Sequence, residues 1–247
     1  MRVVGFDFIG TLCRAGTCED NCVQELFVEL GKSGLNVPYQ EFIEAYNEIA
    51  LKYLEIRKST LREVNNRVWI AEALEKVGVK FDKDDEVIRR AAEAYFRPYV
   101  EMIHVPEYVV PILSDIGRKF KIGLITNFTY APAVHDALER NNLARLFNSI
   151  IISDEVGWRK PHPNIFQRFL EDVSARSSEA FFVGDDPRFD VVGASRVGMK
   201  AILLRSEDTR FSESYYTASL DEWSIRPNLV LQSLDQVRDY LFSIDQS

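Results

Sequence analysis

The chain opens with an apolar run that ends in a carboxylate, a glycine and a hydroxyl: Val3-Val4-Gly5-Phe6-Asp7-Phe8-Ile9-Gly10-Thr11-Leu12. Val3–Phe6 has the length of a strand and no alternation of polar and apolar residues, which is typical of a strand covered on both faces. Five further runs of this kind follow, at residues 122–125, 150–152, 181–183, 201–204 and 229–231. The six runs predict a buried parallel sheet.

Segments with helical periodicity separate most of these runs. They cover residues 107–119, 132–142, 164–173, 190–197 and 235–242. Strands and helices that alternate at this spacing are typical of α/β proteins. We therefore expect an α/β fold, with a doubly wound, Rossmann-like parallel sheet at its core.

Residues 13–104 break this alternation, because they contain helix-period segments and no comparable strand run. The segments cover residues 19–30, 39–56, 61–77 and 84–99. We expect an all-α helical bundle inserted after the first strand. The predicted division is a core domain of residues 1–12 and 105–247, and a helical cap domain of residues 13–104.

Polar residues follow four of the predicted strands. Ligands of doubly wound sheets bind at the carboxyl ends of the strands, so these residues are the candidate site: Asp7, Gly10, Thr11, Thr126, Asn127, Lys160, Asp185, Asp186 and Asp190. Crowded carboxylates need a cation, and oxygen ligands suit Mg²⁺. A carboxylate can attack phosphorus, while hydroxyl, amide and ammonium groups hold the phosphoryl oxygens. Each residue alone could be a helix cap or a loop residue, but their joint placement predicts phosphoryl transfer to an aspartate.

Composition excludes several classes of protein. The 247 residues carry 38 acidic and 30 basic side chains, a formal charge of −8 that argues against nucleic-acid binding. No apolar run is long enough to cross a membrane, and a cytoplasmic protein is expected. Cys13, Cys18 and Cys22 are predicted to be free thiols or to form one local disulfide, since a structural zinc site needs a fourth ligand.

The motifs resemble those of the haloacid dehalogenase superfamily of aspartate-nucleophile hydrolases. The first strand and its Asp-x-x-Gly-Thr, the Thr126-Asn127 pair, Lys160-Pro161 and Gly184-Asp185-Asp186 with Asp190 match the four family motifs in order. The resemblance implies that Asp7 is the nucleophile and that Lys160 orients it. It implies a phosphate site of Thr126, Asn127, Lys160, Gly10 and Thr11. It also implies Mg²⁺ ligands from Asp7, the Ile9 backbone carbonyl, Asp185, Asp186 and Asp190.

One position departs from the family's phosphatases. They carry a second aspartate where this chain has Ile9, and that aspartate protonates the leaving group and later activates water. A positioned acid or base contributes about 10²–10⁴-fold to the rate. We therefore expect a phosphatase of a small phosphorylated metabolite, working through an aspartyl-phosphate intermediate, in which the usual acid/base is missing.

Three alternatives stay open. The chain could be a catalytically weak protein that binds a phosphorylated ligand, or a phosphonatase-like hydrolase, which needs a cap lysine such as Lys32, Lys52 or Lys58. It could also be a 2-haloacid dehalogenase, although keeping Asp185 and Asp186 favours a metal and a phosphorylated ligand. In the cap, Arg57, Lys58, Arg62 and Arg67 either meet an anionic substrate or form ion pairs on a solvated helix face.

Overall fold

The computed structural model describes residues 2–16, 19–206 and 225–245. Within them the chain forms a six-stranded parallel sheet in the order β3-β2-β1-β4-β5-β6. The strands are β1 (Val3–Phe6), β2 (Lys121–Thr126), β3 (Ser149–Ile152), β4 (Ala180–Gly184), β5 (Lys200–Leu204) and β6 (Leu229–Leu231). Each of the six predicted runs lies within one of these strands, and the predicted α/β class is confirmed.

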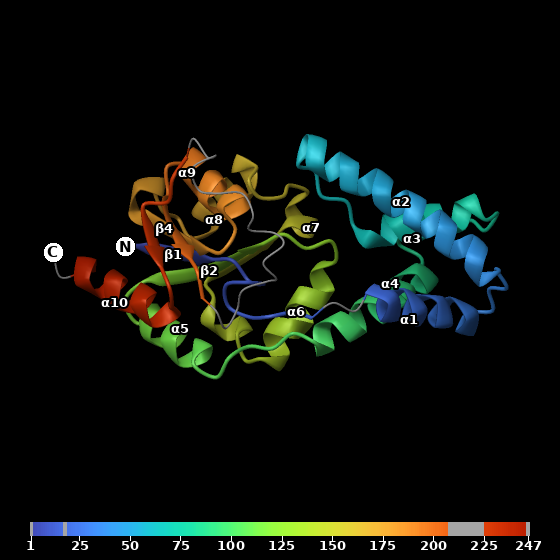
Figure 1. Cartoon of the computed structure of the whole chain (residues 1–247), viewed down its shortest axis with the longest axis horizontal. Coiled ribbons are helices and arrows are strands. Elements are labelled where there is room, and N and C mark those ends of the chain that lie inside the picture. Colours follow the sequence, from blue (N-terminus) through green and yellow to red (C-terminus); the bar gives the residue numbers. More distant parts are fainter. Residues whose placement is uncertain (1, 17–18, 207–224, 246–247) are drawn as a thin grey trace.

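Helices cover both faces of the sheet (Figure 1). They are α5 (Val109–Gly117), α6 (Ala131–Arg140), α7 (Ser153–Val156), α8 (Pro163–Asp172), α9 (Val192–Arg196) and α10 (Leu234–Asp245). Successive strand side chains point to opposite faces. Phe182 of β4 accordingly packs with Phe166 and Phe169 of α8, whereas Phe181 belongs to the cluster that contains α5 and α10.

Four helices lie between β1 and α5 along the chain and stand beside the sheet in Figure 1. They are α1 (Glu19–Lys32), α2 (Tyr39–Thr60), α3 (Asn66–Lys76) and α4 (Glu86–Glu101). The chain enters and leaves this region at one point, because Arg14 and His104 exchange backbone hydrogen bonds of 2.9 and 2.8 Å. A second connection joins residues 61–63 to residues 157–159, where Glu63 N donates to Gly157 O and Arg159 N donates to Leu61 O.

The helix predicted at residues 61–77 begins later than expected, at Asn66. Leu61 adopts a left-handed conformation with φ of 57°, which ends α2. Arg62 then forms a bridge with Trp158, and the Asn65 side chain caps α3 by accepting from Arg67 N. Long-range pairing therefore overrides the apolar periodicity over residues 61–65.

Residues 207–228 form a polar stretch between the last two strand runs, which predicts a surface excursion, but residues 207–224 of it lie outside the described residues. Cys18 also lies outside them, whereas Cys13 and Cys22 are both buried, and Cys13 is a free thiol. No helix in the described part of the chain is long and apolar enough to cross a membrane.

Candidate functional site

Five of the predicted site residues meet at the carboxyl edge of the sheet, where β1, β2 and β4 end side by side. Asp7 directly follows β1, Thr126 ends β2, and Asp185 directly follows β4. Asp190 lies in a π-helical turn over Pro187–Val191, and Lys160 comes from the loop before α8. All five residues are buried, with exposed fractions of 2–8%.

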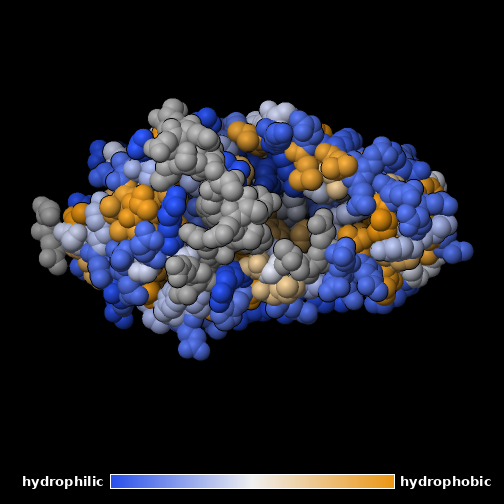
Figure 2. All heavy atoms as spheres, viewed as in Figure 1, coloured by the Kyte–Doolittle hydropathy of each residue, from blue (hydrophilic) through white to orange (hydrophobic). Residues whose placement is uncertain are grey.

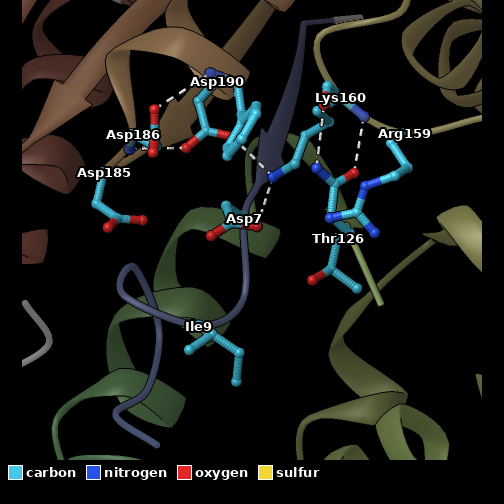
Figure 3. A pocket seen from close by; sticks show the side chains of 10 residues that line it. Asp7, Ile9, Thr126, Arg159, Lys160, Asp185, Asp186 and Asp190 are labelled. Atoms are coloured by element: carbon cyan, nitrogen blue, oxygen red, sulfur yellow. Dashed lines mark hydrogen bonds and ion pairs between the residues drawn. The ribbon is translucent and has the colours of Figure 1, made fainter. Parts of the chain in front are cut away.

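Lys160 lies between two carboxylates (Figure 3). Its Nζ is 2.5 Å from Asp7 Oδ1 and 2.7 Å from Asp190 Oδ1. Burial alone would lower the pKa of Lys160, but Asp190 and Asp7 outweigh it and raise the pKa above its ordinary value. Lys160 is therefore held as a cation that fixes one oxygen of Asp7 and leaves the other, which Figure 3 shows turned toward Asp185, free of that contact.

The side-chain amide of Asn127 holds the backbone of Lys160 in place. Its Nδ2 donates to Lys160 O at 3.1 Å, and its Oδ1 accepts from Lys160 N at 2.7 Å. Both ends of the side-chain amide are thus engaged by one residue. The Asn127 side chain therefore has a positioning contact with Lys160, and its predicted contact with phosphate stays a prediction.

Gly10 and Thr11 support Asp185 instead of facing the pocket. Thr11 Oγ1 donates to Asp185 Oδ1 at 3.1 Å. Gly10 has φ of +93°, and a Cβ at this position would lie 2.3 Å from Asp185 Oδ2. The Gly10 N–H donates to Cys13 O at 2.8 Å, so this amide is not available to an oxyanion.

Asp186 turns away from the other acids. Its carboxylate accepts hydrogen bonds from the backbone N–H of Arg188 and pairs with the Arg188 guanidinium at 2.8 Å. The side chains that can share a metal are instead Asp7, Asp185 and Asp190, each of which offers an oxygen within 4.8 Å of the others. In this arrangement the Asp186 carboxylate caps the turn that carries Asp190.

The charges of this cluster do not balance. Three carboxylates, Asp7, Asp185 and Asp190, face one ammonium, and Asp186 is already neutralised by Arg188. Burial raises the pKa of Asp190 above its usual range despite the opposing effect of Lys160, and Asp7 raises it further. A hard cation with oxygen ligands would relieve this excess, so the residues fit Mg²⁺.

The cluster lines a pocket of about 220 Å³. Ile9 also lines it, along with two residues that the sequence did not single out, Arg159 and Phe189. Arg159 adds a second cation next to Lys160. Basic residues beside a lysine are common in loops, so its position in the sequence did not indicate a functional role. Neither Lys32, Lys52 nor Lys58 lines this pocket, which removes support for a phosphonatase-like reaction that needs a cap lysine.

Arg159 is fixed by a buried carboxylate from the inserted helices. Its guanidinium pairs with Glu63, whose side chain has no exposed surface. Glu63 also pairs with Arg57 Nε at 3.0 Å and accepts a hydrogen bond of 2.6 Å from Ser153 Oγ. Asn65, two residues later, donates to Asp154 at 2.8 Å. The segment between α2 and α3 thus helps to shape the pocket.

The comparisons with known proteins agree with this geometry. A family model described as haloacid dehalogenase-like hydrolase matches residues 6–204. A phosphoserine phosphatase of Thermus thermophilus is 31% identical over 197 residues, which cover 75% of this chain and 77% of that protein. A glyceraldehyde 3-phosphate phosphatase of Methanopyrus kandleri is 32% identical over 113 residues, 45% of each chain.

The fold agrees as well. The crystal structure of a 2-haloacid dehalogenase from Pseudomonas syringae superposes with a TM-score of 0.69 at 23% identity, over 98% of this chain and 99% of that one. The family match spans the strands that carry Asp7, Thr126 and Asp185. The chain belongs to the haloacid dehalogenase-like hydrolase family, and its phosphatase relatives identify it as a phosphatase-like hydrolase.

Proposed function

We propose that this hydrolase is a Mg²⁺-dependent phosphatase that acts on a small phosphorylated metabolite through an aspartyl-phosphate at Asp7. The observation that carries the proposal is the buried cluster in which Lys160 holds one oxygen of Asp7 while Asp185 and Asp190 lie close by. Bound Mg²⁺ would be held by Asp7, Asp185, Asp190 and the Ile9 carbonyl, and it would neutralise charge on the phosphoryl oxygens.

The chain's own residues account for the remaining parts of the reaction. An Asp7 oxygen attacks phosphorus, a new O–P bond forms, and the ester P–O bond breaks with departure of the alcohol oxygen. Lys160 and the Thr126 hydroxyl support the developing charge, and Asn127 keeps Lys160 in register by binding its backbone. Water then attacks phosphorus, the bond between Asp7 and phosphorus breaks, and inorganic phosphate and the Asp7 carboxylate are released. With Ile9 in the acid/base position, the departing alcohol takes its proton from solvent and the attacking water gives its proton to solvent.

Ile9 limits which substrates are turned over. It lines the pocket two residues after Asp7 but has no proton to give and no base to activate water. A leaving group of low pKa departs without protonation, so aryl phosphates should react far faster than alkyl phosphates. The test compares 4-nitrophenyl phosphate with an alkyl phosphate in the presence of Mg²⁺, for the native chain and for Asp7→Asn. The rates compared are kcat/KM values, because these report formation of the aspartyl-phosphate and not its hydrolysis by water, a step that is common to both esters. Equal kcat/KM values for the two esters would contradict an empty acid position.

We further propose that residues 13–104 form a cap domain over a core of residues 1–12 and 105–247. The paired backbone of Arg14 and His104 supports this boundary, because the chain enters residues 13–104 at Arg14 and leaves them at His104. Figure 2 shows a recess in the surface between the core and α2, which supports a cleft between the two parts. Such a cap would exclude water from the aspartyl-phosphate until it opens.

Ile9 also favours a second candidate function, a protein that binds a phosphorylated ligand and turns it over very slowly. Tight binding of a phosphate mimic with no turnover of aryl or alkyl phosphates would support this function. Hydrolysis of 4-nitrophenyl phosphate that disappears in Asp7→Asn would exclude it.

A further inference from the structure

A second pocket lies among the inserted helices, apart from the residues that line the catalytic pocket. It has a volume of about 480 Å³ and is lined by residues of α1, α2, α3 and α4, together with Thr129 of the core. Much of its wall is aromatic, with Tyr46, Trp69, Tyr95 and Phe96. An aromatic wall of this kind suits a ligand with a flat or apolar body.

Three buried polar atoms of residues that line this pocket have no hydrogen-bond partner within the described part of the chain: Asn66 Oδ1, Trp69 Nε1 and Arg57 Nη2. Asn66 is 2% exposed and Trp69 is 6% exposed, so bulk solvent does not satisfy them. The other end of the Asn66 amide donates to the Tyr46 hydroxyl at 3.0 Å. Buried polar groups in native proteins are nearly always paired, so this group of three indicates a ligand that brings its own polar atoms.

The electrostatics of the pocket select an anion. Arg57 lies over the Trp69 ring at 4.3 Å and shares the Glu63 carboxylate with Arg159, so two guanidinium groups face one carboxylate. Burial lowers the pKa of Arg57 to about 10, although Glu63 opposes this, which reflects a cation that is poorly solvated. Among the described residues that line the pocket, Asp20 carries the only carboxylate, and it is exposed.

The same residues link this pocket to the catalytic one. Glu63 pairs with Arg57, which lines the cap pocket, and with Arg159, which lines the catalytic pocket. Thr129 of the cap pocket follows three residues after Thr126 of the catalytic pocket. One buried carboxylate therefore contacts a lining residue of each cavity.

We propose that the cap pocket holds the alcohol end of the substrate, and that this end is an organic acid with an aromatic or apolar body. Its carboxylate would accept hydrogen bonds from Arg57 and from the Trp69 indole N–H, while its phosphate lies against Asp7. This assignment rests on the proposed phosphatase function. It gives the substrate class as a phosphate ester of a hydroxy acid.

The kinetic test uses two aryl phosphates that differ only in charge, 4-carboxyphenyl phosphate and its methyl ester. We expect Arg57→Gln and Trp69→Phe each to lower kcat/KM for the carboxylate by about tenfold or more, the equivalent of losing one charge-assisted hydrogen bond. The methyl ester should lose several-fold less than the carboxylate in each variant, because it presents no charged oxygen to these two side chains. Equal losses for the two esters would contradict the assignment. Lys58→Gln is the matched control, because it removes one charge from the adjacent, exposed residue that does not line the pocket.

The binding test titrates 4-hydroxybenzoate, the product of the carboxylate ester, by calorimetry and does not depend on catalysis. We expect equal affinity in the native chain and Asp7→Asn, and weaker binding in Arg57→Gln and Trp69→Phe. Product binding that is absent or insensitive to these two variants overturns the cap-pocket assignment, even if Asp7-dependent hydrolysis is present. Sensitive product binding without hydrolysis of either ester overturns the proposed function and, with it, the assignment of the pocket to substrate.

Discussion

Lys160 Nζ lies 2.5 Å from Asp7 Oδ1, and the two residues are 2% and 7% exposed. They are 153 residues apart in sequence. The same ammonium reaches Asp190 at 2.7 Å, so one cation from the loop before α8 organises carboxylates from two other parts of the chain. This pairing explains how three acids can stay close together before any metal is bound.

Replacing Lys160 should therefore weaken both the fold and the reaction. In Lys160→Met the buried acids lose their cation, and breaking a buried ion pair costs about 3–5 kcal/mol. Activity should fall by about 10²–10³-fold, because a group that holds the nucleophile and the phosphoryl oxygens is lost. Urea unfolding and turnover of 4-nitrophenyl phosphate measure the two effects. Lys80→Met, at a side chain that is 86% exposed, should change neither.

A second prediction concerns Ile9. Ile9→Asp places a carboxyl group in the pocket where the family's phosphatases have one, and it should raise turnover of alkyl phosphates by about 10²–10⁴-fold. The gain is measured as kcat/KM, which reports formation of the aspartyl-phosphate. The kcat/KM of aryl phosphates should gain much less, since their leaving groups need no proton. Ile9→Asn is the control, because it is polar but cannot act as an acid at neutral pH. A gain of the same size in Ile9→Asn would rule out the proton-transfer explanation.

Metal binding should be visible in stability. The Asp7, Asp185 and Asp190 cluster carries more negative charge than Lys160 balances, so Mg²⁺ should stabilise the folded chain. At a concentration of 100 times Kd, the gain is about 2.7 kcal/mol. Thermal unfolding with Mg²⁺ or with EDTA measures it. Asp185→Asn should greatly reduce the shift, whereas Asp186→Asn should retain most of it if that carboxylate serves Arg188 rather than the metal.

The buried Glu63 gives a prediction about the junction between the inserted helices and the core. Glu63→Gln leaves Arg57 and Arg159 without their shared anion, and an unpaired buried charge costs about 3–5 kcal/mol. Glu75→Gln is the matched control, because its side chain is 61% exposed and 3.8 Å from Lys80. Exposed pairs contribute about 0–1 kcal/mol. Similar changes in urea midpoint for the two variants would show that the Glu63 network is not structural.

Local sequence signals were sufficient for the sheet. Buried parallel strands need continuous apolar runs, and each of the six runs forms a strand. The predicted burial is wrong for β6, because this strand lies at the edge of the sheet, where Val230 is 38% exposed. The same logic placed Asp7, Thr126 and Asp185 at one edge. The start of α3 was missed because residues 61–63 pair with residues 157–159, a contact between distant segments that leaves no local periodicity.

Side-chain partners could not be predicted in the same way. Asp185 and Asp186 are adjacent and chemically identical, yet one joins the acidic cluster while the other turns to Arg188. The two hydrogen bonds between the Asn127 side chain and the backbone of Lys160 are likewise not indicated by the residue types. The network of Glu63, Arg57 and Arg159 was also missed, since Glu63 and Arg159 are 96 residues apart. These choices depend on three-dimensional neighbours that residue types alone do not specify.

The central claim is that Asp7 becomes phosphorylated, and mass spectrometry after rapid acid quenching tests it most directly. The native chain is mixed with 4-nitrophenyl phosphate and Mg²⁺, quenched in acid and digested, with Asp7→Asn treated in parallel. We predict that the peptide containing Asp7 gains the mass of one phosphoryl group in the native chain and gains nothing in Asp7→Asn. Release of 4-nitrophenol without a phosphorylated Asp7 peptide, or with unchanged turnover in Asp7→Asn, would contradict the account.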